Sequence, residues 1–207
     1  MKKAPFVLAA ALAAGISGSA AAQVCNGFPT SPGQYSVAAV ANFPKGYDEF
    51  GVEASYHFSG PLAVNGGILH DSDDGDSLDH LRIGGSWDLA PLNVGMSSPL
   101  SVCPVASLDY VSQDDVTLMS IPVGVGFGLS LPLGADPSGR VMPYVVPALV
   151  IDRLSDPVDA VTETNFGLRG GAIVAFKSFF VAGEVNKVFA DGGRDALFGL
   201  KVGFHAR

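Results

Sequence analysis

Residues 49–58 read Glu-Phe-Gly-Val-Glu-Ala-Ser-Tyr-His-Phe, and this stretch decides the predicted fold. Every second position from Phe50 to Phe58 is apolar, whereas the positions between them, from Glu49 to His57, are polar or glycine. Because successive side chains of a β-strand point to opposite faces, the alternation predicts a strand with one apolar and one polar face. A strand that separates lipid from a polar barrel interior needs this pattern.

The same period of two recurs along the chain, and no strong helical period appears after residue 23. The predicted strands cover residues 34–43, 49–58, 62–70, 80–89, 101–111, 116–131, 141–153, 164–176, 179–188 and 195–205. These segments predict an all-β fold, an antiparallel transmembrane β-barrel of ten strands, with eight strands as the alternative count. An even number places both chain ends on the periplasmic side and the acidic connections outside.

The first 22 residues have the organisation of a secretory signal peptide. Two lysines precede the apolar run 4–14, and small residues ending at Ala22 are typical of a cleavage site. The apolar run is too short to span a membrane, so we expect cleavage rather than an N-terminal anchor. The predicted organisation is a signal peptide over 1–22 and one barrel domain over 23–207.

Composition narrows the class of protein further. Charged residues make up 15% of the 207 residues, 26 residues are glycine, and the formal net charge is −8. An acidic chain with scattered Lys and Arg lacks the basic patch that nucleic-acid binding requires, so no nucleic-acid partner is predicted. No apolar run of transmembrane-helix length follows the leader, so a membrane-spanning form of this chain must be a closed barrel.

The chain contains two cysteines, Cys25 and Cys103. In an exported protein an even cysteine count favours a disulfide, and only one pairing exists here. Two free buried thiols or a metal pair are the alternatives, but no further His or Cys lies at ligand spacing. Cys25 precedes the first predicted strand and Cys103 opens the fifth, so we expect both near the periplasmic rim, joined by a bridge.

The leader, the even succession of hairpins and the last strand resemble the small outer-membrane β-barrel proteins, a group that includes the OmpA-like and OmpX-like barrels. The most specific stretch is Leu-Phe-Gly-Leu-Lys-Val-Gly-Phe at 197–204, which is similar to the terminal strand that the barrel-assembly machinery reads. The chain departs from the usual form by continuing for three residues after that aromatic. The resemblance is one of pattern, and it implies a location in the cell outer membrane. It also implies three partners, which are outer-membrane lipids, lipopolysaccharide and the assembly machinery.

Six charged residues fall on the predicted interior faces of the strands. They are Glu53, Arg82, Asp109, Arg169, Glu184 and Lys201. Isolated buried charges are costly, so we expect these residues to pair or to stay hydrated. Side chains largely fill a barrel of eight to ten strands, which favours a plugged lumen over a gated pore lined by ion pairs.

The predicted loop 71–79 holds five aspartates, and carboxylates at such spacing suit a calcium ion. The spacing does not match a helix–loop–helix calcium loop, because Gly75 and Arg82 stand where acidic ligands belong. We therefore expect a solvated extracellular turn here. No metal site and no cofactor is predicted.

Two patterns would suit an enzyme. His57-Phe58-Ser59 has an H-x-S spacing similar to that of outer-membrane lipid A deacylases, but Ser59 falls in a turn at the predicted periplasmic rim. His70 and His80 flank the aspartate-rich loop and supply residue types that an outer-membrane protease uses. The favoured interpretation is a non-catalytic barrel with a structural or surface-interaction role. A lipid A hydrolase or protease and a narrow solute channel are the alternatives.

Overall fold

The structure is a computed structural model that describes residues 34–45, 48–58, 61–72, 79–89, 100–113, 115–134, 139–190 and 193–206. In this part of the chain, antiparallel strands form one sheet. Its strands are β1 (Tyr35–Phe43), β2 (Asp48–His57), β3 (Leu62–Ser72), β4 (Asp79–Trp87), β5 (Leu100–Gln113), β6 (Val116–Leu129), β7 (Leu131–Pro132), β8 (Arg140–Ser155), β9 (Ala160–Ala175), β10 (Phe179–Phe189) and β11 (Leu197–Ala206). No helix among the described residues is long and apolar enough to cross a bilayer.

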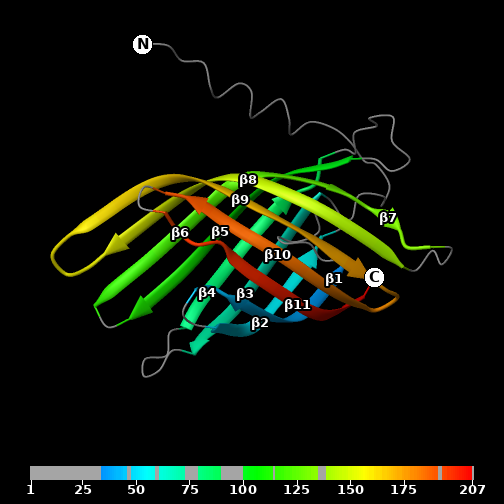
Figure 1. Cartoon of the computed structure of the whole chain (residues 1–207), viewed down its shortest axis with the longest axis horizontal. Coiled ribbons are helices and arrows are strands. Elements are labelled where there is room, and N and C mark those ends of the chain that lie inside the picture. The colour runs from blue at the N-terminus through cyan, green and yellow to red at the C-terminus, as the bar shows by residue number, and fades with distance from the viewer. Residues whose placement is uncertain are drawn as a thin grey trace, which may run out of the picture.

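The sheet closes into a barrel. Each long strand pairs with the strands next to it in sequence, β1 pairs with β11, and β6 pairs with β8. The two residues of β7 follow β6 and pair with the start of β8. The closed barrel therefore has ten strands, and Figure 1 shows its hairpins side by side around the wall. The predicted fold class and the count of ten are confirmed.

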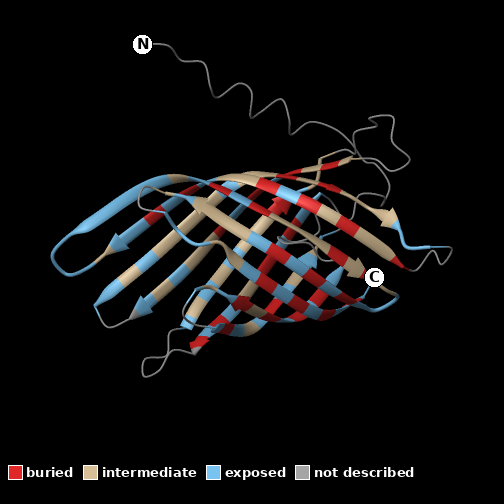
Figure 2. Cartoon of the chain, viewed as in Figure 1, coloured by how far each residue is buried: buried red, intermediate tan, exposed pale blue. Residues whose placement is uncertain are grey.

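Side chains alternate between the two faces of the barrel wall. In β11, Phe198, Leu200 and Val202 point outward and are more than half exposed, whereas Gly199 and Lys201 between them are buried. Figure 2 shows the same alternation as red and blue bands along β10 and β11. Successive residues of β11 therefore face opposite sides of the barrel wall.

Exposed aromatic side chains form two incomplete rings on the outside of the barrel, one at each rim. The terminal rim, where β1 begins and β11 ends, carries Tyr35, Tyr56, Phe58, Trp87, Phe179 and Phe204. The opposite rim, called the distal rim below, carries Phe43, Phe50, Tyr110, Phe166, Phe189 and Phe198. Within β1 the two rings are eight residues apart, which is about 26 Å along the strand. An apolar band between two aromatic girdles is what a lipid bilayer requires of a barrel.

Four strands, β5, β6, β8 and β9, are 14 to 16 residues long and form a wall that continues past the distal ring. β8 and β9 stay paired as far as Ser155 and Ala160. The predicted strands left 154–163 as the connection between them, and that prediction is wrong for most of the segment. The ladder continues where no lipid demands apolar alternation, and β-branched residues such as Thr162 and Thr164 favour the strand.

The turn that joins β8 to β9 is ordered by its own aspartates. The backbone N–H groups of Val158 and Asp159 donate to Oδ1 of Asp156, at 2.8 and 2.7 Å. These two hydrogen bonds stabilise the charged carboxylate and lower the pKa of Asp156. The wall therefore ends in a tight turn rather than in a long flexible connection.

Candidate functional site

The interior of the barrel has an apolar layer toward the terminal rim. Met142 on β8 and Ile173 on β9 are fully buried, and Phe180 at the start of β10 is almost as well covered. They belong to one cluster of buried residues that also contains Cys103 and Val146. The sequence argument considered only charges in the lumen and missed this layer. The sequence pattern that could have revealed this layer is the pair Met142 and Val146, two apolar residues on the inward-facing positions of β8.

A belt of charged and polar groups lies on the distal side of this layer, near the middle of the strands. Nζ of Lys201 lies 3.0 Å from Oε2 of Glu53, and both side chains are at least nine-tenths buried. The Tyr144 hydroxyl donates to Oε2 of Glu184 at 2.9 Å. From the sequence Lys201 could pair or stay hydrated, and Glu184 on the adjoining strand was one carboxylate that it could neutralise. Its ion pair is instead with Glu53, two strands away across β1.

The other predicted lumen residues lie on the same interior face. Arg82 on β4 and Asp109 on β5 stand opposite each other in register and form an ion pair. Arg169 on β9 is buried and helps to line the cavity described below. With Tyr144 on β8, the belt thus draws its members from seven strands around the barrel.

Inward glycines make room for these large side chains. A Cβ atom added at Gly199 would lie 2.8 Å from Oδ1 of Asn42 and 2.9 Å from Cγ of Glu184. A Cβ atom added at Gly203 would lie 2.8 Å from the Phe180 ring. These separations are shorter than van der Waals contact, so the glycines permit a densely packed interior.

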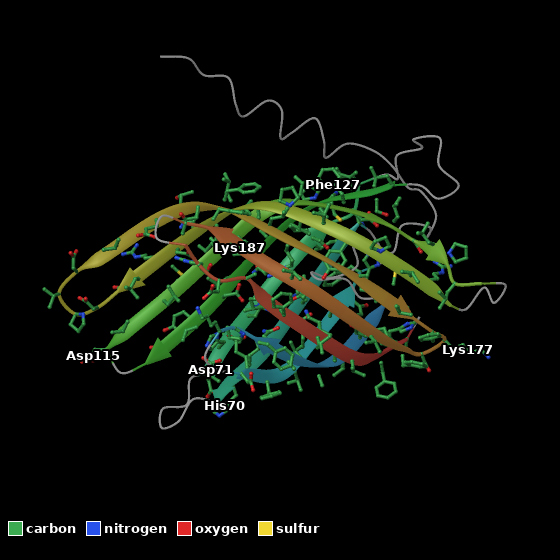
Figure 3. All side chains as sticks on the ribbon, in the orientation of Figure 1. His70, Asp71, Asp115, Phe127, Lys177 and Lys187 are labelled. Atoms are coloured by element: carbon green, nitrogen blue, oxygen red, sulfur yellow. The ribbon has the colours of Figure 1, made fainter. Side chains whose placement is uncertain are left out.

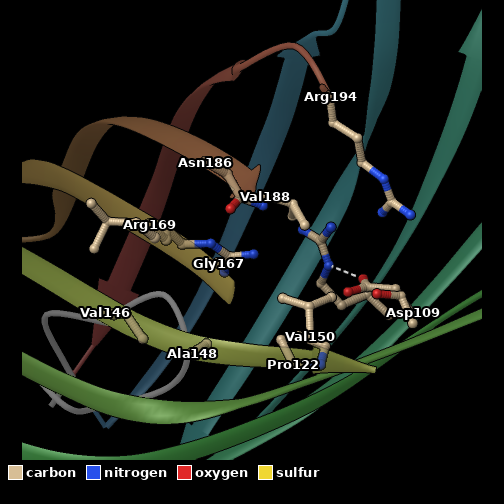
Figure 4. A pocket seen from close by; sticks show the side chains of 13 residues that line it. Asp109, Pro122, Val146, Ala148, Val150, Gly167, Arg169, Asn186, Val188 and Arg194 are labelled. Carbon is tan, nitrogen blue, oxygen red and sulfur yellow. Dashed lines mark hydrogen bonds and ion pairs between the residues drawn. The ribbon is translucent and has the colours of Figure 1, made fainter. Parts of the chain in front are cut away.

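A small cavity of about 90 Å³ lies on the distal side of the belt. Figure 4 shows Arg169 and Arg194 reaching toward it, with the Asp109 ion pair drawn dashed. Nη1 of Arg194 lies 2.6 Å from Oδ2 of Asp152, so a carboxylate already neutralises this arginine. Ligand pockets for small molecules usually enclose about 300–1,000 Å³. The cavity is of a size for a few water molecules rather than a substrate.

The distal rim brings together Glu49 on β2, Asp71 on β3 and His80 on β4. One potential ligand atom from each lies within 4.8 Å of those of the other two. Asp71 was expected in a solvated turn, and that expectation is wrong. Asp71 belongs to β3, points into the barrel and is 4% exposed, because strand pairing continues to Ser72. Figure 3 labels Asp71 at this end of the barrel and Lys177 at the other.

A second His–Asp pair lies on the outside of the same rim. Nδ1 of His70 lies 2.9 Å from Oδ1 of Asp79, and both side chains are more than half exposed. His70 and Asp79 face each other in register, one position away from the inward-facing Asp71 and His80. The alternation of strand faces therefore separates the two pairs, although the sequence pattern placed both aspartates in one loop with the two histidines flanking it.

Several predicted features fall outside the described residues. Cys25 does, so the bridge between Cys25 and Cys103 stays a prediction, and Cys103 itself is buried near the start of β5. Ser59 also falls outside them, whereas His57 is the last residue of β2 and lies on its inward face. The signal peptide over 1–22 likewise stays a prediction.

Asp88 follows β4 at the terminal rim, and burial shifts the pKa of its carboxyl group. Its backbone N–H donates to the carbonyl oxygen of Pro61 at 2.6 Å, which fixes it beside the preceding hairpin. Its Oδ1 atom is buried, with no hydrogen-bond donor among the described residues. Burial raises the pKa of Asp88 to about 7, so the carboxyl group titrates near neutrality.

Comparison with known proteins yields structural likeness only. No family model matches the sequence, and no curated protein sequence matches it. The KdgM porin in complex with disordered oligogalacturonate has a TM-score of 0.46 and 10% identity, over 83% of this chain and 99% of that one. LpxR from Salmonella typhimurium has a TM-score of 0.44 and 11% identity, over 77% and 73%. The outer membrane protein Omp33 of Acinetobacter baumannii has a TM-score of 0.36 and 12% identity, over 84% and 98%.

At these identities the likeness concerns strand arrangement, and it does not single out the OmpA-like or OmpX-like group. The membrane assignment rests on the molecule itself. A closed barrel leaves no unpaired sheet edge, its outward face is largely apolar between two aromatic rings, and the buried charges Glu53, Arg169, Glu184 and Lys201 point inward. Lipid requires each of these features, and antiparallel barrels of this kind are built into outer membranes. The chain is an outer-membrane β-barrel.

Proposed function

We propose that this protein is a closed, non-catalytic barrel whose role in the outer membrane is structural or directed at partners on the cell surface. One observation carries the proposal, which is the two-layer filling of the interior. Met142, Ile173 and Phe180 form the apolar layer toward the terminal rim. The pair of Lys201 and Glu53 belongs to the belt above it.

The two layers oppose ion passage for different reasons. An ion that enters the apolar layer loses its hydration and gains no polar partner there, which is strongly unfavourable. In the belt, opposite charges already satisfy one another, so a passing ion would have to break an existing pair. Both arguments favour the plugged lumen over the narrow solute channel.

The wall beyond the distal ring supports a role at the surface. Leu118, Leu154 and Val161 stand directly opposite one another on three neighbouring strands, and all three are exposed. Three adjoining exposed apolar side chains on a wall outside the lipid band suit contact with another molecule. We propose outer-membrane lipids and lipopolysaccharide as the neighbours of the barrel, and the assembly machinery as the reader of its last strand.

Conductance in planar lipid bilayers tests the closed lumen. Purified wild-type barrel should produce no regular current steps. A variant in which Met142→Gly and Ile173→Gly are combined removes the two fully buried apolar side chains of this layer and should raise the current. Leu200→Ala, a change on the lipid face, should leave the wild-type behaviour as it is. Regular current steps from the wild type would support the channel instead, and release of acyl chains from lipid A would support the hydrolase.

A further inference from the structure

We propose that Glu49, Asp71 and His80 bind a divalent transition-metal ion such as Zn²⁺ inside the distal mouth of the barrel. This inference is independent of the closed lumen. It also departs from the expectation, drawn from the sequence, that the chain has no metal site.

Strand register builds the site. Glu49 on β2 faces Asp71 on β3 directly. His80 on β4 pairs with Leu69, two residues before Asp71 on the same face, so its ring reaches Asp71 diagonally. Asn42 on β1 faces Glu49 and donates from Nδ2 to its Oε2 at 2.8 Å. The amide thereby holds the Glu49 carboxylate in place, as a supporting residue does beside a metal ligand.

The distances suit shared coordination. Nε2 of His80 lies 3.0 Å from Oδ2 of Asp71. Bonds of about 2.0–2.2 Å from zinc to nitrogen and oxygen place two neighbouring ligand atoms about 3 Å apart. An ion could therefore take both atoms with little movement, and a Glu49 oxygen within 4.8 Å needs only a small side-chain shift.

The charges favour an ion at this position. Glu49 and Asp71 are 5% and 4% exposed, and among the described residues neither forms an ion pair with Lys or Arg. Oδ1 of Asp71 is buried and accepts no hydrogen bond from a described group. Two adjoining buried carboxylates with one oxygen unsatisfied are costly, and a bound cation would relieve both problems.

The donor set selects the class of ion. One imidazole nitrogen with two carboxylate oxygens suits zinc and its first-row neighbours. Calcium instead takes six to eight oxygen atoms, which this site does not offer among the described residues. Three protein ligands leave a further coordination position for water or for a group entering from the mouth.

The test uses full-length barrel, refolded in detergent after chelation, and Zn²⁺ as the titrant in calorimetry. We expect one Zn²⁺ to bind per wild-type chain. Asp71→Asn and His80→Gln should each weaken binding by about tenfold or more, and Asn42→Ala should weaken it less. The matched controls are His70→Gln and Asp79→Asn, which alter the exposed pair one residue away and should leave zinc affinity unchanged.

Shifted gel mobility of the unboiled protein shows that each variant is folded. If His80→Gln does not fold, Glu49→Gln takes its place. The absorption spectrum of the Co²⁺-loaded wild type gives a further readout, and it should show nitrogen and oxygen ligation without a thiolate band. Absence of stoichiometric zinc binding by the wild type overturns the proposal. So does an equal loss of affinity in His80→Gln and His70→Gln.

Discussion

Replacing Lys201 by methionine should strongly destabilise the barrel, because it leaves the buried carboxylate of Glu53 without its positive partner. Nζ of Lys201 lies 3.0 Å from Oε2 of Glu53, and the two side chains are 3% and 10% exposed. Methionine retains much of the apolar length of lysine, so the main loss is the ion pair. Removing one member of a buried pair costs about 3–5 kcal/mol, since the remaining charge is left without compensation.

The free energy of unfolding should be measured by urea titration of barrel folded in lipid vesicles. Lys201→Met should lose about 3–5 kcal/mol, whereas the combined change with Glu53→Gln should recover a large part of this loss. Lys177→Met is the matched control, because Lys177 is exposed in the turn before β10. It should change stability by less than about 0.5 kcal/mol. Equal effects of Lys201→Met and Lys177→Met would refute the buried pair.

Three further changes test the lipid face, the packed interior and the terminal rim. Leu200→Arg places a charge in lipid and should cost about 2–4 kcal/mol near the bilayer midplane, and refolding as stable as the parent would contradict the outward assignment. Gly199→Ala should cost about 1–3 kcal/mol in the same titration through contact with Glu184 and Asn42, and a neutral result would show that the interior is looser than described. Unfolded Asp88 loses its proton near pH 3.8 and folded Asp88 near 7, so stability should fall as pH rises from about 4 to about 7. Asp88→Asn should lack that fall, and parallel pH profiles for the two proteins would contradict the perturbed carboxyl group.

The strands could be predicted because lipid imposes a strict pattern on them. In β11 the outward Phe198, Leu200 and Val202 alternate with the inward Gly199 and Lys201, as a strand between lipid and a packed interior requires. The pattern weakens beyond the lipid band. Residues 154–163 therefore read as a loop, although backbone pairing carries both strands through most of this segment.

The partners inside the barrel were harder to predict, because they depend on closure. Glu53 and Lys201 are 148 residues apart in sequence, and they meet only because β1 pairs with both β2 and β11. Asp71 was assigned to a turn for a local reason, since it opens a run rich in aspartate. The inward-facing position that it shares with Glu49 and His80 follows from a strand two residues longer than predicted.

The membrane-spanning barrel is tested most directly by the single tryptophan of the chain. Trp87 ends β4, points outward and lies in the aromatic ring of the terminal rim. In vesicles that contain brominated lipids, bromine near the headgroups should quench Trp87 fluorescence more strongly than bromine near the bilayer centre. The emission of the folded protein should also lie at shorter wavelength than that of the unfolded chain. Emission that no brominated lipid quenches would contradict the account.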